Sequence, residues 1–319
     1  MSSSTNMTRQ ERKREEKLEA MSSAARVKLG VSDIIVRTLG YVIVSFYALC
    51  CIFPFLLIVG TSFSDEAVIR RAGVQLIPRG FTTRAYQMII SGGTIWKSYA
   101  LTITLTAVGT FLGLAIISMT GYALQRKDYP YRNVISFYIY FTSLFSAGLA
   151  PYYLMMVQTY RLKDNYLAVL LPLMMSPWLI ILMKNFVKQI PHEITEAGKI
   201  DGAGDMTVFT HLILPMMKPA LATIGLFLAL GYWNEWYQSS LFLSSKVEVK
   251  PLQYTLYELV NKIAALKNSV AGQYIALSDF PQETVKMANA VMATGPIVLL
   301  YPFVQKYFIG GITVGAVKG

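Results

Sequence analysis

Acids and glycines gather in one short segment of the sequence, residues 190–215, which reads IPHEITEAGKIDGAGDMTVFTHLILP. After its first proline this segment holds four acids and three glycines, whereas long apolar runs flank it on both sides. The pair His192-Glu193 lacks the second histidine of a zinc-protease motif, and His211 stands alone. The whole sequence has no phosphate-binding glycine loop, no paired acids at catalytic spacing and no His/Cys cluster. The segment therefore indicates recognition, and we expect no enzyme activity of the chain itself, no metal and no cofactor.

The local pattern of this segment predicts two short helices joined by a turn. Pro191 suits the first turn of a helix, where its missing N–H is not needed. Glu196 follows near the positive end of that helix dipole. Gly202 and Gly204 then favour a sharp turn with positive φ. A second helix is predicted to begin with Asp205 as its N-cap and to run to the Leu-Pro pair.

The first predicted helix has a narrow apolar stripe, because Ile194, Ala197 and Ile200 recur at steps of three residues. Acids lie on its other side. A docking element that enters a cleft of another protein needs this combination of a small apolar face and an acidic face. An amphipathic connector between two membrane spans would carry the same pattern, so spacing alone leaves both interpretations open.

The rest of the chain must position this segment, and its composition is that of a membrane protein. Of the 319 residues, 54% are hydrophobic and 15% are charged, against about 25% charged in a soluble domain. A run of about 20 apolar residues crosses a bilayer as a helix. We therefore predict an all-α, polytopic membrane domain over residues 38–319, preceded by a basic N-terminal segment, 1–37. Its six predicted spans are 38–62, 98–124, 133–156, 166–184, 217–242 and 285–305.

Charge predicts the orientation of these spans. Residues 1–37 hold eight Lys/Arg and no apolar core, so they are not a cleavable signal peptide. The excess of Lys/Arg in alternate connections favours a cytoplasmic N-terminus and C-terminus. Segment 190–215 then lies inside, and loops 63–97 and 243–284 lie outside. This arrangement accounts for most of the net charge of +11, and no nucleic-acid partner is expected.

The acidic segment also resembles a known family. Its runs Glu196-Ala197-Gly198, Asp201-Gly202-Ala203 and Leu214-Pro215 are similar to the Glu-Ala-Ala loop of type I ABC importer permeases. A glycine falls six residues after the glutamate and the Leu-Pro pair ends nineteen after it, as in that family. Gly198 departs from the pattern, because a second alanine is usual there. The resemblance implies a coupling helix that rests in a groove of a cytoplasmic ATPase, with Glu196, Ala197, Gly198, Asp201, Gly202, Leu214 and Pro215 as the coupling residues.

The C-terminal region, residues 287–319, resembles carbohydrate permeases of the maltose-transporter type. Its run YPFVQKYF is most similar to the branch for complex oligosaccharides, including aldouronates, in Gram-positive bacteria. The resemblance implies a permease subunit that imports a sugar or oligosaccharide by alternating access. Implied partners are a second homologous permease, an ATPase dimer that hydrolyses the ATP, a lipid-anchored or periplasmic sugar-binding protein and membrane lipid. The tail with Gly311, Gly315 and Lys318 would reach the ATPase interface, although a frayed terminus is an alternative.

A possible substrate pathway lies at the outer end of the fifth predicted span, which reads GYWNEWYQSS. Trp233, Asn234, Glu235 and Trp236 combine aromatic faces with amide and carboxylate groups, as sugar sites do. Polar groups inside a bilayer are costly and tend to face protein or water. An aromatic belt at the membrane interface would give a similar pattern, so both interpretations stay open.

Other interpretations of the chain have distinct expectations. Loop 243–284 occupies the position where such permeases contact their binding protein, and a solvated surface loop is the alternative. A permease for a non-sugar solute would share the Glu-Ala-Ala loop without the YPFVQKYF tail. A non-transporting membrane scaffold would have no reason for a docking helix of this pattern.

Overall fold

The computed structural model describes residues 30–268 and 281–316, and every regular element within them is a helix. The predicted all-α class agrees with this finding. Internal contacts divide the chain into two units, residues 1–57 and residues 58–319. Each unit is described by itself. The basic segment 1–29 lies outside the described residues, as do 269–280 and 317–319.

The described part of the first unit is a single helix, most of α2 (Val31–Ser62). The predicted span 38–62 lies inside this helix, which begins seven residues earlier than the apolar run suggested. Its side chains from Val31 to Pro54 are exposed. A helix that is apolar on all sides suits a lipid environment.

The second unit starts with the last turn of α2 and two short helices, α3 (Glu66–Ala72) and α4 (Arg84–Ser91). Gly60 lies close to the backbone of the loop after α3. An added Cβ there would come 2.3 Å from the carbonyl oxygen of Leu76. Glu66 is buried at 6% exposure. Its carboxylate accepts hydrogen bonds from the backbone N–H groups of residues 283 and 284, at 3.2 and 3.1 Å, and so caps the last long helix.

The second unit contains the 32-residue helix α5 (Thr94–Gln125), which packs along α13 (Lys218–Trp233). Glycines on α5 allow this close approach: an added Cβ at Gly109 would meet the ring of Tyr232 at 2.3 Å. Small residues serve this purpose where membrane helices pack. Helices α8 (Leu167–Met174) and α9 (Pro177–Val187) also pack on α5.

Several predicted spans are broken. Helix α6 (Arg132–Leu144) is followed after a break by α7 (Leu149–Leu154) and the π-helix η1 (Met155–Thr159), with a bend of 114° between them. Residues Asp205–Met216 and Lys218–Phe242 are bent by 82°. Among the described residues, three helices are long and apolar enough to cross a membrane, or up to five if each bent pair is one span. The sixth predicted span falls in α17 (Gln282–Ala316), which is not among these candidates. A total of six spans therefore stays a prediction.

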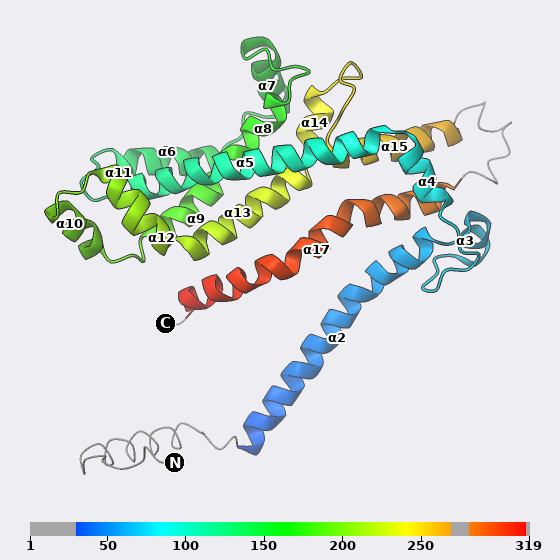
Figure 1. Cartoon of the computed structure of the whole chain (residues 1–319), viewed down its shortest axis with the longest axis horizontal. Coiled ribbons are helices and arrows are strands. Elements are labelled where there is room, and N and C mark those ends of the chain that lie inside the picture. The colour runs from blue at the N-terminus through cyan, green and yellow to red at the C-terminus, as the bar shows by residue number, and fades with distance from the viewer. Residues whose placement is uncertain (1–29, 269–280, 317–319) are drawn as a thin grey trace, which may run out of the picture. The chain divides into compact units, whose positions relative to one another are not determined.

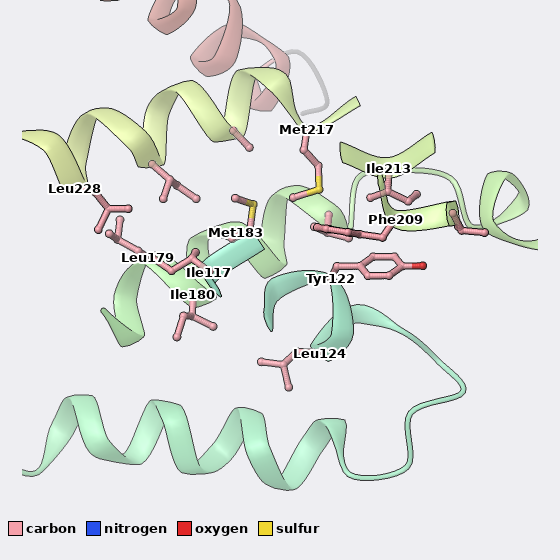
Figure 2. Close-up of a cluster of buried hydrophobic side chains, with 14 residues drawn as sticks. Ile117, Tyr122, Leu124, Leu179, Ile180, Met183, Phe209, Ile213, Met217 and Leu228 are labelled. Atoms are coloured by element: carbon pink, nitrogen blue, oxygen red, sulfur yellow. The ribbon is translucent and has the colours of Figure 1, made fainter. Parts of the chain in front are cut away.

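Helix α5, labelled in Figure 1, has different hydrophobic clusters at its two ends. At its C-terminal end, Ile117 and Tyr122 join buried side chains of α9, α13 and the segment after α10 (Figure 2). At its N-terminal end, Ile95 packs with Trp233 and with residues of α4, α15 (Leu252–Asn268) and α17. The acidic segment and the 243–268 segment therefore lie at opposite ends of the same helix.

Candidate functional site: the 190–215 segment

The acidic segment forms a helical hairpin, as predicted, although its caps differ. Helix α10 (His192–Ile200) has Pro191 as its N-cap and not in its first turn. Helix α11 (Asp205–Thr207) has Gly204 as its N-cap, so Asp205 is its first residue and makes no capping bond. The prediction of Asp205 as N-cap was wrong, because its side chain instead pairs with Arg126, which follows α5, and lies near Lys199 of α10. The hairpin continues through the π-helix η2 (Val208–Ile213) and α12 (Leu214–Met216), which holds the Leu-Pro pair.

The turn between α10 and α11 depends on one glycine. Gly202 has φ +81°, as predicted, whereas Gly204 has φ −70° and does not need to be glycine for this reason. The N–H of Gly202 bonds to the carbonyl of Lys199 at 3.0 Å, and the N–H of Ala203 bonds to the carbonyl of Gly198 at 2.9 Å. These two bonds form a Schellman motif, with Asp201 as the C-cap. The turn is therefore fixed and not a slack connection.

One face of the hairpin is buried in the protein. Gly198 lies against Leu212, and an added Cβ would come 2.7 Å from its Cδ1 atom. Glycine at position 198 therefore leaves room for this close packing. Phe209 and Ile213 are buried, and the rings of Phe209 and Tyr122 are 5.2 Å apart (Figure 2). The hairpin is anchored to the end of α5 by this apolar contact.

The other face of the hairpin is open. Ile200 is 85% exposed, and Ala197 is exposed as well, whereas Ile194 is half-buried. Glu196 is also exposed, with its carboxylate 3.8 Å from Nε2 of His192. An exposed isoleucine beside an acid on one helix is a surface suited to recognition, since nothing within the described residues covers it. We name Glu196, Ala197 and Ile200 the docking face.

A group of four charges joins the hairpin to the loop after α5. Arg126 donates from Nε to Oδ1 of Asp128 at 2.8 Å and pairs through Nη1 with Asp205 at 2.6 Å. A second Arg126–Asp128 bond makes the first pair bidentate. Lys199 lies 2.8 Å from Asp128 and 3.8 Å from Asp205. We call these four residues the charge cluster.

The charge cluster keeps the carboxylate of Asp128 ionised at neutral pH. The Arg126 guanidinium, and then Lys199, keep the pKa of Asp128 well below its usual range. A lowered carboxyl pKa means that the pairing is present at neutral pH and is lost only as pH falls through that lowered pKa. Sequence reasoning missed this cluster. Its only signal in the sequence is the run of charges directly after the predicted span 98–124. That run does not indicate which residues of the 190–215 segment it contacts.

A cavity of about 620 Å³ lies beside the charge cluster, between the ends of α5 and α9 and the start of α10. Its walls carry both signs of charge, including Lys188, Glu193 and Lys199. Within residues 30–268 and 281–316, no group of three metal-ligating side chains is placed to hold an ion.

The four predicted pathway residues divide into two pairs. Trp233 is buried and donates from Nε1 to the carbonyl of Ala293 in α17 at 3.0 Å. Glu235 is buried and bonds to the hydroxyl and N–H of Ser239 at the start of α14 (Tyr237–Phe242). These two side chains are occupied within the chain. Asn234 and Trp236 are exposed at the break between α13 and α14.

An aromatic surface surrounds this break. The rings of Trp236 and Tyr257 are 4.8 Å apart, and Tyr237 lies 6.0 Å from Trp236. Asn234 accepts a bond of 3.4 Å from Gln253 of α15. Sequence reasoning treated 243–284 as a loop and missed α15, although Leu252, Leu256, Leu259 and Ile263 recur at helical spacing.

The predicted ATPase-facing tail is only partly described. Helix α17 continues to residue 316, so Gly311 and Gly315 are helical. Lys318 lies outside the described residues. The role of this tail stays a prediction.

Comparison with known proteins decides the family. Residues 119–314 match the model of the family described as "Binding-protein-dependent transport system inner membrane component". The chain belongs to this family. It is therefore an integral membrane protein and a permease component of an ABC importer, which is a transport subunit and not an enzyme.

Named relatives and a solved structure agree with this assignment. The chain is 36% identical over 274 residues to the polygalacturonan/rhamnogalacturonan transport system permease protein YtcP of Bacillus subtilis (strain 168), covering 86% of this chain and 94% of the relative. It is 29% identical to the arabinooligosaccharides transport system permease protein AraQ of Halalkalibacterium halodurans, covering 88% and 95%. A bacterial ABC transporter involved in the import of the acidic polysaccharide alginate matches with a TM-score of 0.75 and 32% identity, covering 88% of this permease and 98% of that chain.

Proposed function

We propose that this permease imports an oligosaccharide, and that the docking face couples its movement to an ATPase subunit. The observation that carries the coupling proposal is the hairpin with an exposed apolar and acidic face, which is anchored by buried side chains at the C-terminal end of α5. The names of the relatives support the substrate class, because they concern polygalacturonan/rhamnogalacturonan, arabinooligosaccharides and the acidic polysaccharide alginate. A non-sugar solute has no comparable support.

The ATPase contact would use Glu196 as its acidic group and Ile200 as its apolar group. Glu196 would pair with a basic side chain of the ATPase, and Ile200 would be covered on docking. Leu214, Pro215 and Gly202 shape the hairpin and do not need to touch the partner. Asp201 is exposed at the C-cap and lies beside this surface.

The sugar contact would use Asn234 and Trp236, together with the neighbouring Tyr257. These side chains are exposed at a break between helices, where the Trp236 and Tyr257 rings pack together. The Asn234 amide, which bonds to the carbonyl of Leu230 and to Gln253, would exchange the weaker bond to Gln253 for a sugar hydroxyl. Trp233 and Glu235 would support this surface from behind, because their polar atoms are already bonded within the chain. An aromatic belt in the lipid interface remains the competing interpretation of the same residues.

The assembly that we propose contains a second homologous permease, an ATPase dimer and an extracellular sugar-binding protein. Residues 38–319 would form one membrane domain with six spans, and both termini would be cytoplasmic. The exposed apolar side chains of α2 and α6 suit contact with lipid or with the second permease. Loop 243–284, with α15 in it, would face the binding protein.

The test is reconstitution of the complex in proteoliposomes with its ATPase and binding protein, followed by uptake of a panel of labelled oligosaccharides. Glu196→Lys should keep normal membrane insertion but lose ATPase co-purification and uptake, because charge reversal opposes the proposed ion pair. Glu193→Lys, on the same helix and also exposed, is the matched control and should retain both.

Normal ATPase binding and uptake in Glu196→Lys would remove this residue from the coupling contact. Uptake of an amino acid or ion, but of no oligosaccharide, would favour the non-sugar alternative. Purification without any ATPase would favour a scaffold.

A further inference from the structure

We infer that the charge cluster orients α10 on the end of α5 and thereby makes α5 the helix that receives the movement of the docking face. This inference rests on the proposed contact between α10 and an ATPase. It assigns Arg126, Asp128, Lys199 and Asp205 as positioning residues for transport. None of them lies on the docking face.

The four charges close a ring that joins three segments. Arg126 directly follows α5, Asp128 lies in the loop before α6, Lys199 is in the last turn of α10, and Asp205 begins α11. Each cation contacts both acids, so signs alternate around the ring. A movement of α10 relative to α5 must break at least one of these contacts.

The charge cluster is better suited to orienting α10 than to stabilising the fold. The side chains of Asp128 and Asp205 are 51% and 60% exposed, and exposed ion pairs contribute little stability. The hairpin is already anchored by the buried contact between Phe209 and Tyr122. A bidentate guanidinium adds what apolar packing lacks, which is a fixed angle between its partners.

Arg126 is also tied to the body of α5. Its guanidinium carbon lies 5.9 Å from the centre of the Tyr122 ring, one turn earlier in the same helix. It accepts a bond through its carbonyl from Arg132 at 3.2 Å, at the start of α6. A force on Lys199 therefore reaches the end of α5 through Asp128 and Arg126, as well as through the apolar contact.

The far end of α5 meets the extracellular elements of the proposed topology. The hydroxyl of Thr102 accepts a bond of 2.8 Å from the N–H of Leu252 at the start of α15, and Ser98 pairs with Thr255 at 3.0 Å. Ile95 packs with Trp233, next to the proposed sugar contact. A helix of 32 residues spans about 48 Å at 1.5 Å per residue, so α5 links the charge cluster to this region directly.

Neutral and conservative substitutions test the assignment in the complete reconstituted complex. Lys199→Met and Asp205→Asn should keep insertion and ATPase co-purification, but should lower the number of sugar molecules imported per ATP hydrolysed by about two- to fivefold. Lys199→Arg and Asp205→Glu preserve the charges and should retain the wild-type ratio. The double neutral variant should be less impaired than the sum of the single changes, because the two residues share one ring.

Three results would overturn the inference. An unchanged ratio in both neutral variants would show that the ring does not affect coupling. Loss of ATPase co-purification in those variants would make these charges part of the docking contact itself. Equal impairment of the neutral and conservative variants would show that the side-chain charge is not what matters. If the wild-type complex holds no ATPase and imports no sugar, the proposed function fails first, and the inference fails with it.

Discussion

At the scale of single residues, Gly202 decides the geometry of the proposed coupling hairpin. Its φ of +81° lies in the left-handed region, which costs an L-residue roughly 1–2 kcal/mol. The turn carries Asp201 and Lys199 on one side and Asp205 on the other, so strain there would move the docking face and the charge cluster together.

Gly202→Ala should therefore reduce uptake per molecule of inserted permease, because about 1–2 kcal/mol of backbone strain displaces α10. Gly204→Ala is the matched control. It has φ −70°, and an added Cβ would meet nothing within 4 Å, so uptake should be normal. Both variants are measured by uptake normalised to membrane-inserted protein. Equal uptake in the two would show that the turn tolerates the change.

Local sequence rules predicted some of these residues and missed others for one reason. The positive φ of Gly202 follows from glycine's own backbone freedom and needs no distant partner. The role of Asp205 depends on Arg126, 79 positions earlier in the sequence, so a local capping rule assigned it wrongly. Trp233 also has a distant partner, because its indole N–H donates to the carbonyl of Ala293 in α17, and no local pattern indicates that bond.

At the scale of elements, the contact between α5 and α13 depends on glycine at the crossing. Tyr232 cannot turn away freely, because its hydroxyl donates to the carbonyl of Leu170 at 2.7 Å. A methyl group at Gly109 would be 2.3 Å from its ring, so the two helices would have to separate.

Gly109→Ala should destabilise the purified complex by about 1–3 kcal/mol, the usual cost of overpacking. Gly231→Ala, on α13 itself, adds a methyl group that meets nothing within 4 Å, and should be neutral or slightly stabilising. Thermal unfolding of both variants in detergent gives the comparison. A midpoint for Gly109→Ala at or above that of the wild type would contradict the packing argument.

The helices themselves were largely predictable from apolar runs, but their breaks were not. Runs of apolar residues do not distinguish a continuous span from α6 and α7, which differ in direction by 114°. Helix α15 was missed because the length and polarity of residues 243–284 favoured a loop. Its apolar residues pack against α4 and α17, which are distant in the sequence, so local patterns do not show this packing.

At the scale of the whole molecule, the proposed orientation puts the loop after α5 inside the cell and α15 outside. Lys127 is exposed in the first, and Lys262 has a side chain 74% exposed in the second. Lys250 is a poorer reporter, because it is buried and 2.6 Å from Glu258.

An impermeant amine reagent applied to intact cells should therefore modify Lys262 and spare Lys127, and permeabilised cells should show modification of both. Peptide mapping by mass spectrometry identifies the modified lysines. Modification of Lys127 in intact cells would reverse the proposed orientation.

The cap that Glu66 provides has a consequence for biosynthesis. This acid and the N–H groups that it accepts from are 217 and 218 positions apart in the chain. The ribosome therefore releases Glu66 long before α17 exists, and for most of translation the carboxylate has none of the backbone donors that it meets in the finished protein. We expect α17 to be the last helix to pack into the subunit. A nascent chain stopped before residue 282 would therefore expose the uncapped Glu66 carboxylate to the membrane insertion and quality-control machinery.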